Sequence, residues 1–131
     1  MKSAKITFVI VLVLLATACK SDEEVLREKI EQYWQLRITK NFAESYKYEY
    51  PVFKKKVDIN TYVSSRSNPF AVYKEATIKE IKLIKPDLAE VDMVFKVELR
   101  FPPARKPIEV KIKRKEKWVK VDGKWYHVPV T

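Results

Sequence analysis

Few side chains in this sequence could do chemistry on their own. The 131 residues include one His (His127), one Cys (Cys19) and one Gly (Gly123). Zinc sites of the HExxH type need two His, and a disulfide within the chain needs a second Cys, so both are excluded. A single Gly also excludes the phosphate-binding loops, which need several Gly for close approach of the backbone to phosphate. The sequence therefore predicts no metal site, no cofactor and no recognisable catalytic motif.

His127 and Arg37 are the two polar candidates that remain. His127 could act as a general base or a pH sensor, but no Asp or Ser stands at a spacing that would partner it. The alternative is a strand histidine that packs beside Trp118. Arg37, on an apolar helix face, could anchor an anion, although such an Arg more often packs its stem and leaves its head in water. With the nearby aromatic residues, for which core packing is the simpler interpretation, they form a candidate pocket set: Tyr33, Trp34, Arg37, Tyr73, Trp118, Trp125 and His127.

Positive charge is concentrated near the C-terminus. Residues 100–131 hold 10 basic and 3 acidic residues, whereas residues 19–99 hold 15 and 14. Alternation with Val110 and Ile112 predicts that Lys111, Lys113 and Lys115 form a row on one sheet face. Such a row would attract an anionic envelope polymer, lipid headgroups or an acidic protein; the alternative is a solvated face that discourages edge pairing. The predicted basic patch comprises Arg105, Lys106, Lys111, Lys113, Lys115 and Lys117, and we predict Lys54 to Lys56 to be a solvated loop.

The N-terminus predicts export. Lys2 and Lys5 precede an uncharged run over residues 6–18, which is shorter than the roughly 20 residues that span a bilayer. The residues Leu15-Ala16-Thr17-Ala18-Cys19 resemble the lipobox of bacterial lipoproteins, with Ala16 where that family usually has Leu. The resemblance implies that 1–18 is a signal peptide, that Cys19 is lipidated, and that 19–131 is the mature domain. Lys20 after the Cys resembles an outer-membrane destination in a two-membrane bacterium; a short membrane anchor or a buried helix is the alternative.

Helical patterns fill the first half of the mature chain. Ser21 and Glu24 form a capping box, and apolar residues at three- and four-residue spacing predict an amphipathic helix through Ile38. A second, shorter helix is expected over 41–50, ended by Pro51. Asp58 is expected to cap a third turn, and 64–69 to form a loop.

The pattern then changes to a period of two, which is typical of strands. Strands are expected over 76–85, 88–101, 108–121 and 125–130, with stiff proline-rich residues between the second and third. The inward face of the second should hold Val91, Met93, Phe95, Val97, Leu99 and Phe101. Asp122-Gly123 predicts a type I′ hairpin turn, which would pair Lys120 with Trp125, Val119 with Tyr126 and Trp118 with His127.

Helices followed by antiparallel strands predict an α+β fold, with the N-terminal helices packed on one face of a curved antiparallel sheet of three to four long strands. This order resembles the NTF2-like (cystatin-like) superfamily over most of residues 22–130. The nearest local match is Trp118 to Tyr126, which is similar to the terminal hairpin of that superfamily, whereas Lys40-Asn41 stands where Gly-Asp is usual. The resemblance implies a pocket between the long helix and the sheet.

Two functions follow as expectations. The first is a non-catalytic, membrane-anchored envelope lipoprotein that binds a ligand or partner, with its basic C-terminal hairpin facing an anionic partner and no nucleic acid involved. The second is an enzyme of the isomerase or hydrolase type that uses the pocket between the first helix and the sheet; it rests on fold analogy alone.

Overall fold

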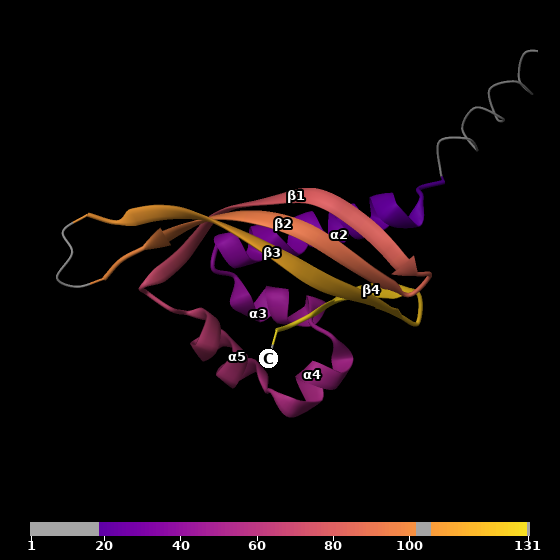
Figure 1. Ribbon diagram of the computed structural model, residues 1–131. Coiled ribbons are helices and arrows are strands. Elements are labelled where there is room, and N and C mark those ends of the chain that lie inside the picture. Colours follow the sequence, from indigo (N-terminus) through magenta and orange to yellow (C-terminus); the bar gives the residue numbers. More distant parts are fainter. Residues whose placement is uncertain (1–18, 102–105, 131) are drawn as a thin grey trace, which may run out of the picture.

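A long helix crosses one face of a four-stranded antiparallel sheet (Figure 1). The structure is a computed structural model that describes residues 19–101 and 106–130; the expected signal peptide, Arg105 and most of the proline-rich loop lie outside those residues. The strands follow one another in the order β1 (Ala71–Lys85), β2 (Leu88–Leu99), β3 (Ile108–Val121) and β4 (Lys124–Val128). The helices precede them: α2 (Asp22–Ile38), α3 (Phe42–Ser45), the 3-10 turn η1 (Tyr46–Tyr48), α4 (Pro51–Lys56) and α5 (Ile59–Arg66). The predicted fold class is confirmed, with three long strands and one short one.

Helix α2 begins and packs as the sequence predicts. The Ser21 Oγ atom accepts a hydrogen bond from the Glu24 amide at 3.2 Å, and three acidic residues occupy the first turn, where they favour the positive end of the helix dipole. Leu26, Ile30, Tyr33 and Trp34 form the buried stripe. Full burial of a large apolar side chain contributes roughly 1.5–3 kcal/mol, so this stripe fixes the helix on the sheet. In the described part of the chain, no helix is both long and apolar enough to cross a bilayer.

The second helical segment differs from the prediction. Helix α3 ends at Ser45 and passes into η1, and Pro51 begins α4 instead of ending a helix. Proline suits the first helical position, because its missing N–H would have no partner there. Tyr50 before it has a ψ of 133°, outside the helical region, as is usual for a residue that precedes proline. Lys54 to Lys56 therefore lie in a helix, and the loop prediction for them was wrong. Asp58 does cap α5, accepting from the Thr61 amide at 2.8 Å, but α5 runs on through Arg66 into the predicted loop.

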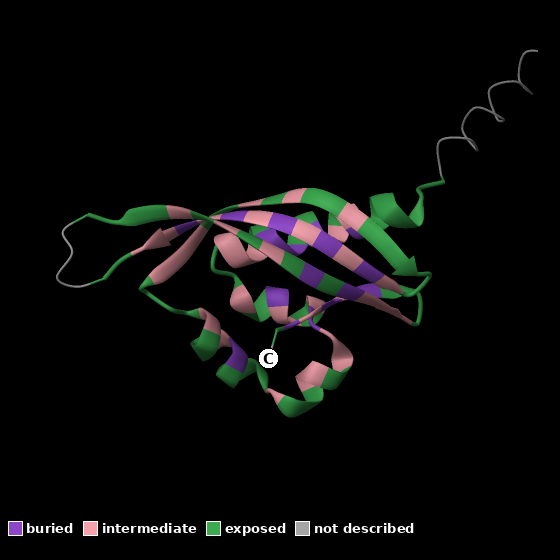
Figure 2. Ribbon diagram, in the orientation of Figure 1, coloured by how far each residue is buried: buried purple, intermediate pink, exposed green. Residues whose placement is uncertain are grey.

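The inward face of β2 is buried from Ala89 to Val97 (Figure 2). Strand β2 ends at Leu99, so Phe101 is exposed beyond it, contrary to prediction. Strand β1 begins at Ala71, five residues before the predicted start at Ala76. Three irregularities in its pairing with β2 shift the side chains from one face to the other, and this blurs the period of two from which strand ends are predicted.

The final hairpin has the predicted register. Trp118 pairs with His127, Val119 with Tyr126 and Lys120 with Trp125. Asp122 and Gly123 both have positive φ, 50° and 78°, as a type I′ turn requires. Strand β4 stops at Val128, before the predicted end at Val130, because Pro129 has no N–H to continue the ladder.

Replacing Gly123 by Ala should lower the free energy of unfolding by about 1 kcal/mol, because the left-handed backbone conformation is less favourable by that amount for a residue with a Cβ. A Cβ at Gly123 would meet no atom within 4 Å, so the loss would come from the backbone alone. Urea unfolding measures it, with Lys124→Ala as the control at the next exposed position. Equal midpoints for Gly123→Ala and the unaltered protein would contradict this account of the turn.

Candidate functional site

A buried network of hydrogen bonds surrounds His127. Its Nδ1 lies 2.5 Å from Glu49 Oε1, and its Nε2 lies 3.0 Å from Glu116 Oε2. All three side chains are buried, His127 being 5% exposed. The sequence offered no partner for this histidine, yet the fold supplies two: Glu49 from the connection between η1 and α4, and Glu116 from β3. We call these three residues the Glu–His–Glu triad.

Helix α2 satisfies the remaining oxygens of the triad. Trp34 Nε1 donates to Glu116 Oε1 at 2.9 Å, and the Tyr33 hydroxyl donates to Glu49 Oε2 at 3.1 Å. Arg37 Nη1 in turn donates to the Tyr33 hydroxyl at 3.2 Å. The Tyr33 ring stacks on the imidazole, with centroids 4.6 Å apart. Each carboxylate therefore has a partner on both oxygens, which is what a buried charge requires.

The triad favours the protonated form of His127, the imidazolium. Burial, the largest single influence, acts to lower the pKa of His127, but the hydrogen bonds and charges of Glu116 and Glu49 together raise it. For Glu116, burial acts to raise the pKa, and the hydrogen bond and charge of His127 overcome it, so that the pKa is lowered. An imidazolium can donate from both nitrogens at once, which matches a carboxylate on each side.

Three arginines meet beside the triad. Arg37 at the end of α2, Arg66 at the end of α5 and Arg114 of β3 line a pocket of about 190 Å³ together with Glu116 and His127. Among the described residues, none of the three has a carboxylate within salt-bridge distance. We call this space the arginine pocket.

Aromatic faces hold the three guanidinium groups in place. Arg37 lies 4.6 Å from the Trp34 ring centre, Arg66 lies 4.8 Å from that of Tyr62, and Arg114 lies 5.3 Å from that of Phe95. The Nε atom of Arg37 is buried and has no hydrogen-bond partner among the described residues. Arg66 Nη1 donates to the Ser65 Oγ atom at 3.0 Å, as Arg37 Nη1 donates to Tyr33. Cation–π contacts themselves occupy no N–H group, so the remaining N–H groups can bind an anion.

A larger groove adjoins the arginine pocket. It holds about 500 Å³ and shares Arg37 and Arg66 with the pocket. Its walls come from the end of α2, α3, α5 and the start of β1, with Ile38, Phe42, Val63, Val72 and Tyr73 among its apolar residues. Two positively charged side chains, Arg37 and Arg66, therefore line both the arginine pocket and the groove.

Comparison with known proteins supports the assignment of the fold. No protein-family model and no curated protein matches the chain. A SEC-C motif containing protein from Rhodopseudomonas palustris superposes with a TM-score of 0.59 at 16% identity, covering 88% of this chain and 83% of that one. The CaMKII hub homology domain of Chlamydomonas reinhardtii gives 0.56 at 16% identity, covering 82% and 94%. The fold is NTF2-like. At these identities, the likeness extends to no ligand and no activity.

In this NTF2-like domain, six of the seven candidate pocket residues form one contact network, but mostly as packed core. Tyr33, Trp34, Tyr73, Trp118 and His127 are linked by ring contacts, and Arg37 joins them through its guanidinium. Only Arg37 and His127 line the arginine pocket, and Arg37 and Tyr73 line the groove. Trp125 belongs to the same buried core, but it lies near the β3–β4 turn, where its ring centre is 5.7 Å from Lys120 Nζ.

The sequence analysis missed Glu49, Arg66, Arg114 and Glu116. For two of them a signal was available: if Lys111, Lys113 and Lys115 face outward, the period of two turns Arg114 and Glu116 inward. Inward charges in a strand are rare unless they are paired or functional. Glu49 and Arg66 lie in short helices and their connections, where no period indicates a direction.

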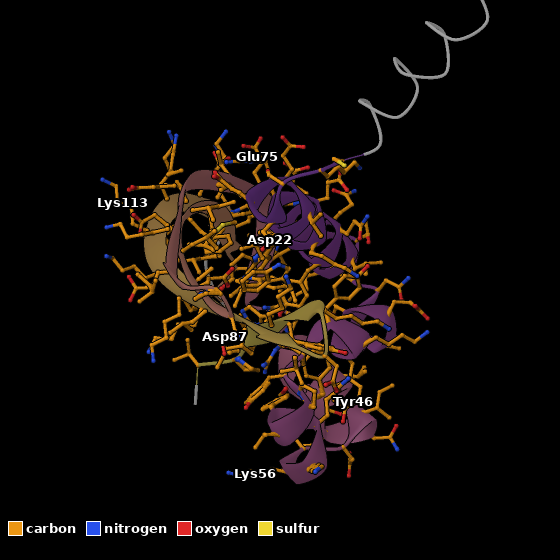
Figure 3. All side chains as sticks on the ribbon, turned by 90° about the vertical axis from the view of Figure 1, so that its right-hand side faces the viewer. Asp22, Tyr46, Lys56, Glu75, Asp87 and Lys113 are labelled. Carbon is orange, nitrogen blue, oxygen red and sulfur yellow. The ribbon has the colours of Figure 1, made fainter. Side chains whose placement is uncertain are left out.

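The lysine row of β3 lies on the outer face of the sheet, as predicted. Lys111, Lys113, Lys115 and Lys117 are exposed, and Figure 3 shows Lys113 extending from the sheet on the side away from α2. Strand β2 offsets part of this charge, because Lys115 approaches Asp92 at 3.9 Å and Lys117 pairs with Glu90. Lys111 and Lys113 lie opposite Lys96 and Val94. Because neither lies opposite an acidic residue on β2, these two lysines form the positively charged part of the row. Lys106 is exposed at the start of this region.

The triad should make the stability of the domain depend on pH. Because the pKa of His127 is raised on folding, its contribution is complete below its unfolded pKa of about 6.5 and is lost as pH rises through the folded value. Because the pKa of Glu116 is lowered, its contribution is present above about 4.5 and is lost as pH falls through the folded value. Urea midpoints between pH 5 and 9 should therefore decline toward the alkaline end.

The control is His127→Gln, whose midpoint should be lower at pH 6 and should lack the alkaline decline. Parallel curves for the variant and the unaltered protein would show that His127 is not charged in the folded state.

Proposed function

We propose that this protein is an exported, lipid-anchored envelope lipoprotein whose NTF2-like domain binds an anionic ligand without transforming it. The observation that carries the proposal is the arginine pocket, which is lined by three arginines from separate elements. Among the described residues, none of the three forms an ion pair. Gathering like charges costs free energy, and an anionic ligand would recover that cost on binding.

Charge and shape favour a carboxylate or phosphate group attached to an apolar body. The three arginines carry +3, and Glu116 is the one carboxylate that lines the pocket among the described residues, so the pocket keeps a positive excess. Guanidinium groups bind such oxyanions through paired N–H bonds. The adjoining groove, with its Ile38, Phe42 and Val63 side chains, offers space for an apolar portion of the same molecule.

The state of His127 supports binding over acid–base catalysis. Both ring nitrogens are hydrogen-bonded to carboxylates, so neither is free to exchange a proton with a ligand. A general base needs direct access to the proton that it removes. The isomerase or hydrolase alternative has no other buried histidine on which to rest, since His127 is the only one in the sequence.

A macromolecular anionic partner is a second candidate for the outer sheet face. Lys111 and Lys113 have no acidic residue opposite them on β2, and such a pair would attract an anionic envelope polymer, lipid headgroup or acidic protein in a salt-sensitive manner. The test below separates this face from the arginine pocket.

Arg114→Gln and Lys113→Gln remove one positive charge from adjacent residues of β3 that face opposite ways. With 4-phenylbutanoate as the probe in calorimetric titration near neutral pH, Arg114→Gln should weaken binding roughly tenfold, because a charged hydrogen bond contributes about 1.5 kcal/mol or more. Lys113→Gln should leave the affinity within about twofold.

Neutral 4-phenylbutanamide serves as the ligand control and should bind weakly to all three proteins. Loss of binding in Lys113→Gln alone would move the anion site to the outer sheet face. Equal binding of the acid and the amide would remove the arginines from the account.

The envelope assignment rests on the N-terminal residues. Cys19 is exposed and unpaired, and only Lys20 stands between it and the Ser21 cap of α2. Acyl chains on this thiol would hold the domain at a membrane, since each buried CH₂ contributes about 0.8 kcal/mol. In an organism with two membranes, Lys20 favours the periplasmic face of the outer one.

Expression of the full chain in a bacterial host tests the anchor. We expect the protein in the membrane fraction, with a mature N-terminus at Cys19 and the mass of an acylated chain. Cys19→Ser should leave the membrane fraction or retain residues 1–18, whereas Ser21→Ala should behave as the unaltered chain. A native chain that begins at Met1 and stays in the cytosolic fraction would overturn the assignment.

A further inference from the structure

Three segments converge at the end of the domain where α2 begins. In Figure 1 the start of α2 lies beside the β1–β2 turn and the β3–β4 turn, at the right-hand end of the sheet. Lys120 joins the three: its Nζ donates to Asp22 Oδ1 at 3.2 Å, and its amide donates to the Asp87 carbonyl at 2.8 Å. Lys120 therefore links the start of α2 to both turns.

The chain between Cys19 and α2 has little slack. Only Lys20 and Ser21 intervene; Ser21 caps the helix, and Lys20 Nζ donates to Glu28 at 2.6 Å. Three extended residue steps reach about 10 Å at most. An acylated Cys19 would therefore hold this end of the domain within about that distance of the headgroups.

The same end exposes apolar side chains. Leu83 and Ile84 are 44% and 46% exposed, and Lys82 and Lys85 flank them in the sequence. The pairing of β1 with β2 is irregular between Leu83 and Lys85, so Ile84 falls outside the regular alternation of the strand. We call residues 82–85 the KLIK edge. Two apolar residues between two lysines suit the boundary between acyl chains and phosphates, where lysine stems lie along the lipid and their charges reach the headgroups.

We propose that the KLIK edge is the surface with which the domain rests on its own membrane. The proposal rests on the lipidation of Cys19 proposed above. The occupant is the bilayer that holds the anchor, because the short tether brings this edge to that bilayer. Arg37 lies fifteen residues beyond Asp22 along α2, which is about 22 Å at 1.5 Å per residue. This membrane contact, which we call the seat, would therefore hold the arginine pocket away from the membrane and accessible to dissolved ligand.

Site-specific labelling tests the orientation. Acylation blocks the Cys19 thiol, so an introduced Cys becomes the single free thiol of the lipidated full chain. Ile84→Cys and Phe70→Cys form a matched pair, because both native side chains are 46% exposed and they stand at opposite ends of β1. Each lipidated protein is labelled with a nitrobenzoxadiazole fluorophore and reconstituted into phosphatidylethanolamine–phosphatidylglycerol vesicles that contain a doxyl-labelled lipid.

We expect the doxyl lipid to quench the probe at position 84 at least threefold more than the probe at position 70. Cys19→Ser versions of both proteins, mixed with the same vesicles, should show little quenching at either position. Equal quenching at 70 and 84, or stronger quenching at 70, would overturn the seat while leaving the anchor intact. If the fluorescence of the probe at position 84 is the same with and without vesicles and indicates burial in both cases, the edge contacts a second copy of the chain. That result would also overturn the proposed membrane contact.

The label count separates the two proposals. One fluorophore per lipidated chain, with the acyl mass at Cys19, shows that the anchor is present, so the quenching result judges the seat alone. Two fluorophores per chain show a free Cys19 thiol, and then the anchor and the seat that depends on it both fail.

Discussion

The fold around the candidate site depends on one buried ionic contact, the imidazolium of His127 between the carboxylates of Glu49 and Glu116. Removing charges from water costs several kcal/mol per ion unless each is paired and hydrogen-bonded. The triad meets that condition because Trp34 and Tyr33 satisfy the outer carboxylate oxygens. Four segments are thereby joined: α2, the connection between η1 and α4, β3 and β4. A backbone hydrogen bond joins two of these segments as well, because the Tyr50 amide donates to the His127 carbonyl at 2.8 Å.

This contact explains why three arginines can share one small pocket. The Glu116 carboxylate lies at the pocket wall beside His127, so it partly offsets the mutual repulsion of the guanidinium groups. Helix α2 contributes as well, because Arg37 lies in its last turn, where the helix dipole favours a cation. The compensation is incomplete, and a residual positive charge beside an apolar groove is what an amphipathic anion recognises.

Sequence patterns predicted the parts of this molecule that local rules govern. The cap at Ser21, the stripe from Leu26 to Trp34 and the Asp122-Gly123 turn each depend on residues close together in the chain, and each was found as expected. The triad depends on a separation of 78 residues between Glu49 and His127, and no local period reports such a contact. The bulges of β1 and the helix begun by Pro51 were missed because the same residue types also suit regular strands and helix ends. Six of the candidate pocket residues were grouped correctly, yet the charges that give the pocket its chemistry were not among them, except for Arg37 and His127.

Helix α2 connects the end of the domain that carries the proposed anchor with the arginine pocket. Its first residue, Asp22, is held by Lys120 at the end where the anchor would lie, and its last turn presents Arg37 to the pocket. The buried stripe between them, from Leu26 to Trp34, fixes the helix on the sheet. A rigid helix of this kind sets the distance from membrane to ligand site, whereas a flexible linker would leave that distance free. Because Tyr33 and Trp34 in the same helix also complete the triad, any movement of α2 along the sheet would break hydrogen bonds to both buried carboxylates. The residues that would orient the domain on the membrane and those that shape the arginine pocket are therefore parts of one rigid unit.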